Sequence, residues 1–269
     1  MGTRVIKGFT IIETVLFLGV TGLLVLGAMV GVGANVNIQR YKDATETFNA
    51  TIQSLYSDVT NVQNGRSSNQ YCNSIAAVID DPGGDERGQS RCMIIGKYVR
   101  LIKGDVTTYN VLAVENASFS PSASDTDVSI LHDKYYLNLS QTDSIKTKME
   151  WGTEIIKQIT PTTTSDRGTI LIVRSPESGQ IYTFSSNTVP TDTDIANLGT
   201  TVSPAFVRDM VVAGDTTPGQ AAQTYCIESS GLFSQGQMAI YIAPYATSSS
   251  AVELVSNDTL ASKGLPYRC

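Results

Sequence analysis

The sequence is poor in the side chains that carry out chemistry. It has one histidine and four cysteines among 269 residues, and these residue types supply many of the nucleophiles, bases and soft metal ligands of proteins. His132 stands beside Asp133, but the sequence contains no Gly-x-Ser-x-Gly nucleophile elbow, phosphate-binding glycine loop or zinc-type Cys/His spacing. We therefore predict that the protein is not an enzyme, with no catalytic residue, metal site or cofactor, and we expect His132 to lie in a turn.

Charged residues are also scarce. They make up 16% of the chain, the net charge is −6 and the isoelectric point is near 4.8. A nucleic-acid-binding domain normally presents a basic face. The composition therefore predicts no specific nucleic-acid site.

The most distinctive part of the sequence is a long apolar segment near the N-terminus. Thr14 to Ile38 contains no charged residue, and about 20 apolar residues are enough to cross the hydrocarbon core of a bilayer as a helix. Glu13 lies just inside the edge of this segment. An unpaired carboxylate in that position costs about 2.5–3.5 kcal/mol or more, so we expect Glu13 to have a partner.

The residues before the apolar segment resemble the N-terminus of type IV prepilins. Arg4 and Lys7 lie in a short leader that ends at Gly8, and Phe9 and Glu13 follow it. The resemblance implies that a prepilin peptidase cleaves between Gly8 and Phe9 and methylates the new amine of Phe9. It also implies that Glu13 engages the N-terminal amine of a neighbouring subunit during filament assembly.

The same resemblance sets the expected domain organisation and location. We expect a leader over residues 1–8, a transmembrane and filament-core helix over 9–38, an amphipathic helix over 39–64 and a β-rich extracellular head over 65–269. Basic residues favour the cytoplasmic side, so the head should face outwards from a single span in the cytoplasmic (inner) membrane. After assembly the subunit should reside in a cell-surface filament. Its implied partners are the prepilin peptidase, other pilin subunits, the pilus assembly machinery and the membrane.

Two simpler interpretations of the N-terminus remain open. A secretory signal peptide could be cleaved after Val32-Gly33-Ala34, although its apolar core normally has about 7–15 residues and no acid. A plain membrane anchor would explain neither the Gly8-Phe9 pair nor Glu13.

The helical pattern continues beyond the apolar segment. From Gln39 onwards, apolar residues recur at spacings of three and four, which predicts an amphipathic helix. The sequence Asn64-Gly65 is a typical stop signal, so we expect one helix from Phe9 to Gln63. Its apolar stripe consists of Tyr41, Ala44, Phe48, Ile52, Leu55, Val59 and Val62.

The remainder of the chain is rich in strand signals separated by turn residues. These signals predict an α+β fold in which a mostly antiparallel sheet packs on the second half of the long helix, as in pilin heads. We expect loops over 116–127 and 188–204, and the segment 145–159 is ambiguous. The clearest hairpins are predicted at 169–185 and 224–243. The other expected strands are 91–96, 98–102, 107–114, 134–139, 206–212 and 252–255.

Four cysteines in a translocated domain indicate two disulfides. Pairing by nearness in sequence predicts Cys72–Cys92 and Cys226–Cys269, although four cysteines allow three connectivities. The second bridge resembles the disulfide near the C-terminus of many pilins. A cluster of acidic residues and glycines from Asp80 to Glu86 is expected to be a solvated turn, with calcium binding left open.

The predicted function is that of a structural subunit of a type IV pilus. The head of roughly 200 residues favours a minor or unusually large pilin, and adhesion, motility or DNA uptake would follow from the resemblance alone. One alternative is a pseudopilin of a type II secretion or competence system, which shares the same N-terminus. An alternative of another class is a secreted or membrane-tethered enzyme that uses the helix only as an anchor.

Overall fold

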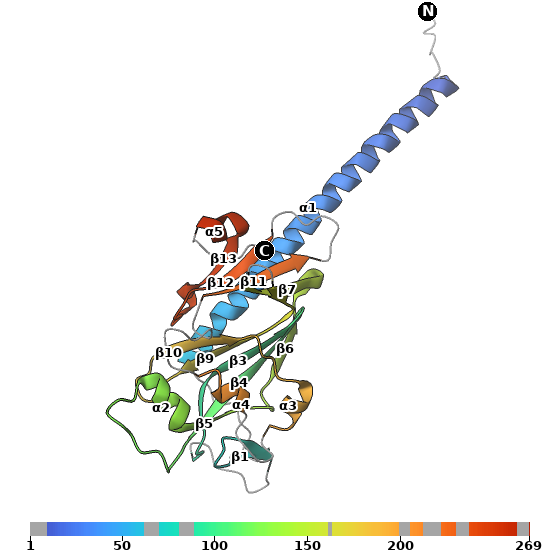
Figure 1. The fold of residues 1–269 in the computed structure, drawn as a ribbon. Helices are drawn as coiled ribbons and strands as arrows, with labels where there is room; N and C mark the ends of the chain where they lie inside the picture. The colour runs from blue at the N-terminus through green and yellow to red at the C-terminus, as the bar shows by residue number, and fades with distance from the viewer. Residues whose placement is uncertain are drawn as a thin grey trace, which may run out of the picture.

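The fold is α+β, as predicted: a long N-terminal helix packs its second half against antiparallel sheets (Figure 1). The computed structural model describes residues 10–61, 70–80, 89–160, 163–198, 205–211, 222–229, 237–262 and 269. Leader residues 1–8, Phe9, and Val62 and Gln63 at the expected helix end lie outside the described residues.

Helix α1 spans Ile11–Thr60, a length of 50 residues or about 75 Å. It begins with a capping box, in which the Thr10 hydroxyl accepts a hydrogen bond from the backbone N–H of Glu13. The N-terminal half projects from the head, and the C-terminal half packs one face against the sheets (Figure 1).

The predicted apolar stripe is the face of α1 that the head buries. Among the described residues of the stripe, Tyr41 is half-buried and the others are buried. Thr45 and Tyr56 are buried as well, which makes the face wider than predicted. The buried members of the predicted stripe are Ala44, Phe48, Ile52, Leu55 and Val59.

Within its described residues, the head contains two main sheets and one short two-stranded sheet, all of them antiparallel. The first main sheet has the order β10-β9-β3-β4-β5, with β6 also pairing with β4, and the second has the order β13-β12-β11-β7-β8. The first sheet consists of β3 (Met93–Ile102), β4 (Asp105–Glu115), β5 (Tyr135–Leu139), β6 (Ile145–Lys148), β9 (Arg167–Arg174) and β10 (Ile181–Ser186). The second consists of β7 (Thr153–Thr160), β8 (Thr163–Ser165), β11 (Gln223–Ser229), β12 (Met238–Ile242) and β13 (Val252–Ser256), and the short sheet consists of β1 (Gln70–Cys72) and β2 (Val78–Asp80).

The main core lies between α1 and both large sheets. Val99 of β3 and Ile170 of β9 pack in the same cluster as Ile52 of α1 and Ile227 of β11. Side chains alternate across a strand. The residues of β3 and β9 that lie between those of the main core therefore point to the opposite face of the first sheet. There, a second cluster is covered by the short helices α2 (Asp127–Asp133) and α4 (Ala205–Arg208).

Several local predictions were wrong. Strand β3 runs through Gly96 without ending, with a bulge between Ile94 and Gly96. A side chain at Gly96 would collide with the carbonyl oxygen of Ile172 on the neighbouring strand. This glycine therefore marks a close approach of two backbones and not a turn.

The short helices were not predicted. Segment 206–212 was expected to be a strand, but its first residues belong to α4. Helix α2 begins in the segment that we expected to be a loop, and α3 (Asp192–Ala196) interrupts the expected loop over 188–204. Residues 145–159 form β6, the 3₁₀ turn η1 (Glu150–Gly152) and most of β7. A further 3₁₀ turn η3 (Ser249–Ala251) precedes β13, and α5 (Asn257–Ser262) follows it.

Candidate assembly helix and its junction with the head

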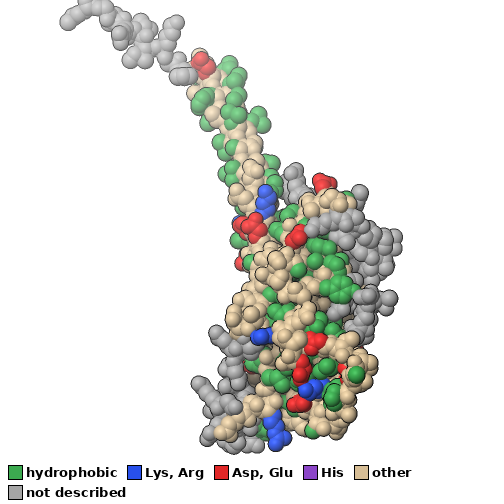
Figure 2. Space-filling model, turned by 90° about the vertical axis from the view of Figure 1, so that its left-hand side faces the viewer, with side chains coloured by type: hydrophobic (Ala, Val, Ile, Leu, Met, Phe, Trp, Pro, Cys, Tyr) green, Lys and Arg blue, Asp and Glu red, His purple; other side chains and the backbone are tan. Residues whose placement is uncertain are grey.

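The N-terminal half of α1 exposes an apolar surface to its surroundings. Its large hydrophobic side chains are each at least half exposed, and Figure 2 shows hydrophobic side chains along the projecting part of the helix. A window of 18 residues has a mean hydropathy of 2.5 and no buried residue, so the helix is long and apolar enough to cross a membrane. The exposed side chains are Ile11, Ile12, Val15, Leu16, Phe17, Leu18, Val20, Leu23, Leu24, Val25, Leu26, Met29, Val30 and Val32.

The two threonines within this half satisfy their hydroxyl groups locally. The Thr14 hydroxyl donates to the carbonyl oxygen of Ile11 at 2.8 Å, and the Thr21 hydroxyl donates to that of Phe17 at the same distance. Neither hydroxyl therefore needs water. This arrangement suits a helix that lies in lipid or against other helices.

Glu13 is the N3 residue of the capping box at the start of α1. Its Oε2 accepts hydrogen bonds from the backbone N–H and the hydroxyl of Thr10, each at 3.3 Å. The spacing Thr10-x-x-Glu13 is a capping-box pattern, a signal that our reasoning from the sequence missed. Gly8 and Phe9, the predicted cleavage and methylation residues, lie outside the described residues, so the predicted role of Glu13 towards a neighbouring amine stays a prediction.

Tyr41 joins the helix to the second sheet at the base of the head, the end from which the apolar half of α1 projects. Its hydroxyl donates to the carbonyl oxygen of Ile227 at 2.7 Å and accepts from the backbone N–H of Met238 at 2.8 Å. Ile227 and Met238 face each other in the β11–β12 ladder, so the phenol closes the end of this hairpin. Burial raises the pKa of Tyr41 above its ordinary value of 10.0, which keeps the hydroxyl protonated.

Two further polar contacts fasten α1 nearer its C-terminal end. The side-chain amide of Gln53 donates to the carbonyl oxygen of Val252 at 2.9 Å. The Tyr56 hydroxyl lies 3.0 Å from the Thr183 hydroxyl, which itself donates to the carbonyl oxygen of Ala246. Since Thr183 has a single hydroxyl proton, Tyr56 is the donor in their bond. These contacts and the buried stripe hold the helix and the head together as one unit.

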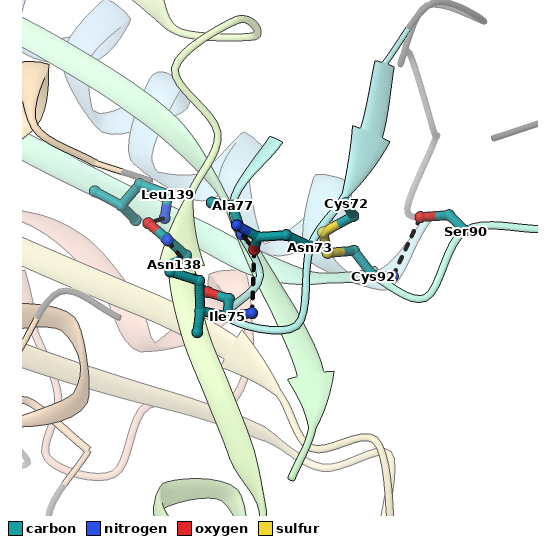
Figure 3. The surroundings of a disulfide bond; sticks show 8 residues. All are labelled: Cys72, Asn73, Ile75, Ala77, Ser90, Cys92, Asn138 and Leu139. Carbon is teal, nitrogen blue, oxygen red and sulfur yellow. Dashed lines mark hydrogen bonds between the residues drawn. A yellow bond between two sulfur atoms is a disulfide. The ribbon is translucent and has the colours of Figure 1, made fainter. Parts of the chain in front are cut away.

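Both predicted disulfides are present in the structure. Cys72–Cys92 joins the end of β1 to the segment that leads into β3. As Figure 3 shows, Asn73 beside it organises the turn, because its side-chain oxygen accepts hydrogen bonds from the backbone of Ile75 and Ala77. The buried Asn138 of β5 donates to the carbonyl oxygen of Ile75 at 3.3 Å. The small sheet is thus attached to the first large sheet.

The second disulfide fastens the last residue of the chain. Cys226 lies on β11 and is buried, and Cys269 packs in a cluster with residues of β12, β13 and α5. Asn257 forms two hydrogen bonds with Cys269: its side-chain oxygen accepts from the backbone N–H at 2.8 Å, and its amide donates to the carbonyl oxygen at 3.1 Å. The C-terminal residue is therefore bound to β11 by a covalent bond and to α5 by two hydrogen bonds.

His132 lies in the last turn of α2 and belongs to a surface ion-pair group. Its Nδ1 is 2.6 Å from Asp133 Oδ1, and the guanidinium of Arg208 lies 3.2 Å from the same oxygen. The hydrogen bond from His132 and the nearby Arg208 hold the pKa of Asp133 below its ordinary value. These contacts join α2 to α4.

The described residues contain no group of three or more histidine, cysteine or acidic side chains arranged to hold a metal ion. Most of the acidic segment from Asp80 to Glu86 lies outside the described residues, so its predicted solvated turn is not tested. Asp80 itself accepts a hydrogen bond from the side chain of Gln70 at 2.8 Å across the β1–β2 pair.

No protein-family model matches this chain, and neither does any curated protein or any solved structure. The function must therefore be inferred from the N-terminal residues and from the geometry of α1 and the head.

Proposed function

We propose that this chain is a structural subunit of a type IV pilus-like filament. In this proposal, the N-terminal half of α1 holds the subunit in the cytoplasmic membrane before assembly, and the same half packs with other subunits in the filament core afterwards. The observation that carries the proposal is a single uninterrupted helix with an exposed apolar half and a half buried in the head.

The exposed apolar surface must be shielded from water. Fully burying a large aliphatic or aromatic side chain stabilises a protein by about 1.5–3 kcal/mol, and the exposed half of α1 carries a whole series of such side chains. Contiguous apolar surfaces of this kind mark sites of membrane or protein contact. Lipid would cover the surface in the stored subunit, and neighbouring copies of the same helix would cover it in a filament.

Small residues on the same half of α1 favour close packing between helices. Apart from its chain neighbours and the adjoining backbone of α1, a side chain added at Gly22, Gly27 or Gly31 would meet no described atom within 4 Å. These glycines therefore do not serve the packing of this subunit. Small residues allow membrane helices to approach one another closely, which supports a role of this surface in contacts between subunits.

The head has the properties expected outside the cytoplasm. Arg4 and Lys7 precede the apolar segment and favour a cytoplasmic N-terminus. The head on the other side carries two disulfides, which form in oxidising compartments. The proposed partners are a prepilin peptidase, other copies or related subunits, and the assembly machinery of the membrane.

The proposed processing is tested by the intact mass of the protein isolated from membranes or filaments. The proposal predicts a chain that begins at Phe9 and carries one additional methyl group. A chain that begins at Asn35 would show that the apolar segment is an ordinary signal peptide, and the proposal would be wrong. A Gly8→Ala variant provides the matched control, because blocked cleavage should leave the leader attached while the head folds normally.

A further inference from the structure

Trp151 is the only tryptophan of the chain, and the fold holds it in an exposed position. It lies in η1, has a φ of 56° and is 55% exposed. This left-handed conformation is rare for a residue with a large side chain. The residues on either side are firmly attached: the backbone N–H of Met149 donates to Gly104 at 2.8 Å, and the Thr153 hydroxyl donates to Glu150 at 2.9 Å.

Trp151 lies level with the place where α1 leaves the head. The guanidinium carbon of Arg40 is 4.6 Å from the centre of the indole ring, a cation–π contact. Arg40 is the first basic residue after Lys7 in the sequence. Long side chains on a helix lean towards its N-terminus, which brings the guanidinium of Arg40 nearer to the apolar half of α1.

The apolar segment places this pair at a membrane surface. Thr14–Ala34 contains 21 residues, which span about 32 Å as a helix and match a hydrocarbon core of about 30 Å. Polar residues begin at Asn35, and Arg40 lies about 8 Å further along the helix axis. Because the headgroup layer on each side is about 5–8 Å thick, Arg40 and the indole beside it lie at the outer edge of this layer.

We propose that Trp151 and Arg40 together anchor the base of the head in the outer headgroup layer of the membrane that α1 spans. Tryptophan concentrates at membrane–water boundaries because its ring is apolar and its N–H is polar. The long side chain of an arginine can extend along the helix and place its charge among the headgroups. The partner is the phosphate and glycerol region of lipids. Asp43 and Glu46 on the following turns of α1 and Glu150 beside the indole are acidic, so the contact should not require anionic lipid.

The anchor fixes the depth of the whole helix. Glu13 and Arg40 are 27 positions apart, or about 40 Å along the axis. With Arg40 and Trp151 in the outer headgroup layer, Glu13 lies at the opposite edge of the hydrocarbon core. The inference rests on the proposed function only in requiring that α1 spans a membrane.

The single tryptophan makes a direct test possible. The full chain is reconstituted into phosphatidylcholine vesicles, and Trp151 fluorescence is measured with lipids brominated near the glycerol end or near the methyl end of the acyl chain, and with acrylamide in the water. We expect the strongest quenching from bromine near the glycerol end and only weak quenching by acrylamide. Full acrylamide quenching without lipid quenching would overturn the proposal.

A matched reporter places a tryptophan on another part of the head. Tyr245 has a similar exposure of 52% and a similar φ of 54°. The next residue, Ala246, is bound through Thr183 to Tyr56, which lies about 24 Å beyond Arg40 along α1. In the double variant Trp151→Tyr, Tyr245→Trp, the new tryptophan should be quenched by acrylamide and not by brominated lipid. Equal lipid quenching at both positions would contradict an anchor at Trp151.

Vesicle flotation separates this inference from the proposed function. If the chain floats with vesicles but Trp151 is not quenched by lipid, the anchor is wrong and the membrane helix stands. If the chain does not float, α1 does not insert, and both the anchor and the proposed storage in a membrane are wrong.

Discussion

The two halves of α1 should respond differently to the same substitution. Leu55 lies in the buried half and is 4% exposed, whereas Leu24 lies in the projecting half and is 68% exposed. We predict that Leu55→Ala destabilises the head and that Leu24→Ala leaves its stability unchanged. The two variants remove the same atoms from the same helix, so helix propensity does not separate them.

The expected size of the effect follows from the packing of Leu55. It belongs to the main core with residues of both large sheets, and Leu→Ala changes in such cores cost about 2–5 kcal/mol because they leave a cavity. For a head of this size, each kcal/mol lowers the melting temperature by about 2–4 °C. Leu55→Ala should therefore lower it by about 4–20 °C. Leu55→Met conserves volume and should cost less than about 1.5 kcal/mol.

The measurement is thermal unfolding of the full chain in detergent micelles, followed by near-ultraviolet circular dichroism, which reports side-chain packing in the head. Detergent covers the apolar half in every variant. Equal melting temperatures for Leu55→Ala and the unmodified chain would show that the second half of α1 is not part of the head core. An equal loss in Leu24→Ala would show that the projecting half contributes to head stability, contrary to the structure.

Three further predictions concern the ends of the chain and one surface network. Glu13→Ala and Glu13→Gln should both leave a cleaved, folded subunit but abolish or sharply reduce filaments, and Glu13→Asp should be intermediate. Gln preserves the capping box, so Glu13→Gln removes only the charge. Filaments of normal number in Glu13→Gln would therefore show that the charge is not needed. Replacing Cys226 and Cys269 by serine opens a loop with a sequence separation of 43, which should cost about 4 kcal/mol in chain entropy; an unchanged denaturant midpoint would contradict this. Hydrogen bonds, first from Lys134, hold the pKa of Glu177 below its ordinary value of 4.5. The stabilisation by Glu177 is therefore complete above that value and is lost as the pH falls through the lowered pKa. Glu177→Gln should flatten the acid side of a stability–pH curve, and an identical curve would show that this contact does not stabilise the fold.

Elements with a long or regular pattern were predictable from the sequence. The stripe of α1 repeats at helical spacing over many turns, so burial of its face was correctly predicted. Hairpin β9–β10 was found because strand-forming residues flank a turn that contains Pro176 and Gly179, and Gly179 adopts a φ of 73°. In both cases local preference and tertiary packing favour the same structure.

Other features depend on contacts that the sequence does not reveal. Segment 206–212 contains β-branched residues and was predicted as a strand, but Phe206 packs 6.0 Å from the ring of Tyr98 in a short helix on the outer face of the first sheet. Tertiary packing outweighs strand propensity there. The division into two large sheets follows from long-range pairs such as β3 with β9, which have no local signal. The left-handed backbone conformation of Trp151 was equally unpredictable from the sequence.

In the proposed function, this chain polymerises through the N-terminal half of α1. The decisive experiment is electron microscopy of surface filaments from cells that produce the chain, with gold label directed at a tag in the head. We expect label on filaments, and loss of that label in Glu13→Ala cells that still hold the folded subunit in the membrane. Label confined to the membrane in cells that display normal filaments would contradict it.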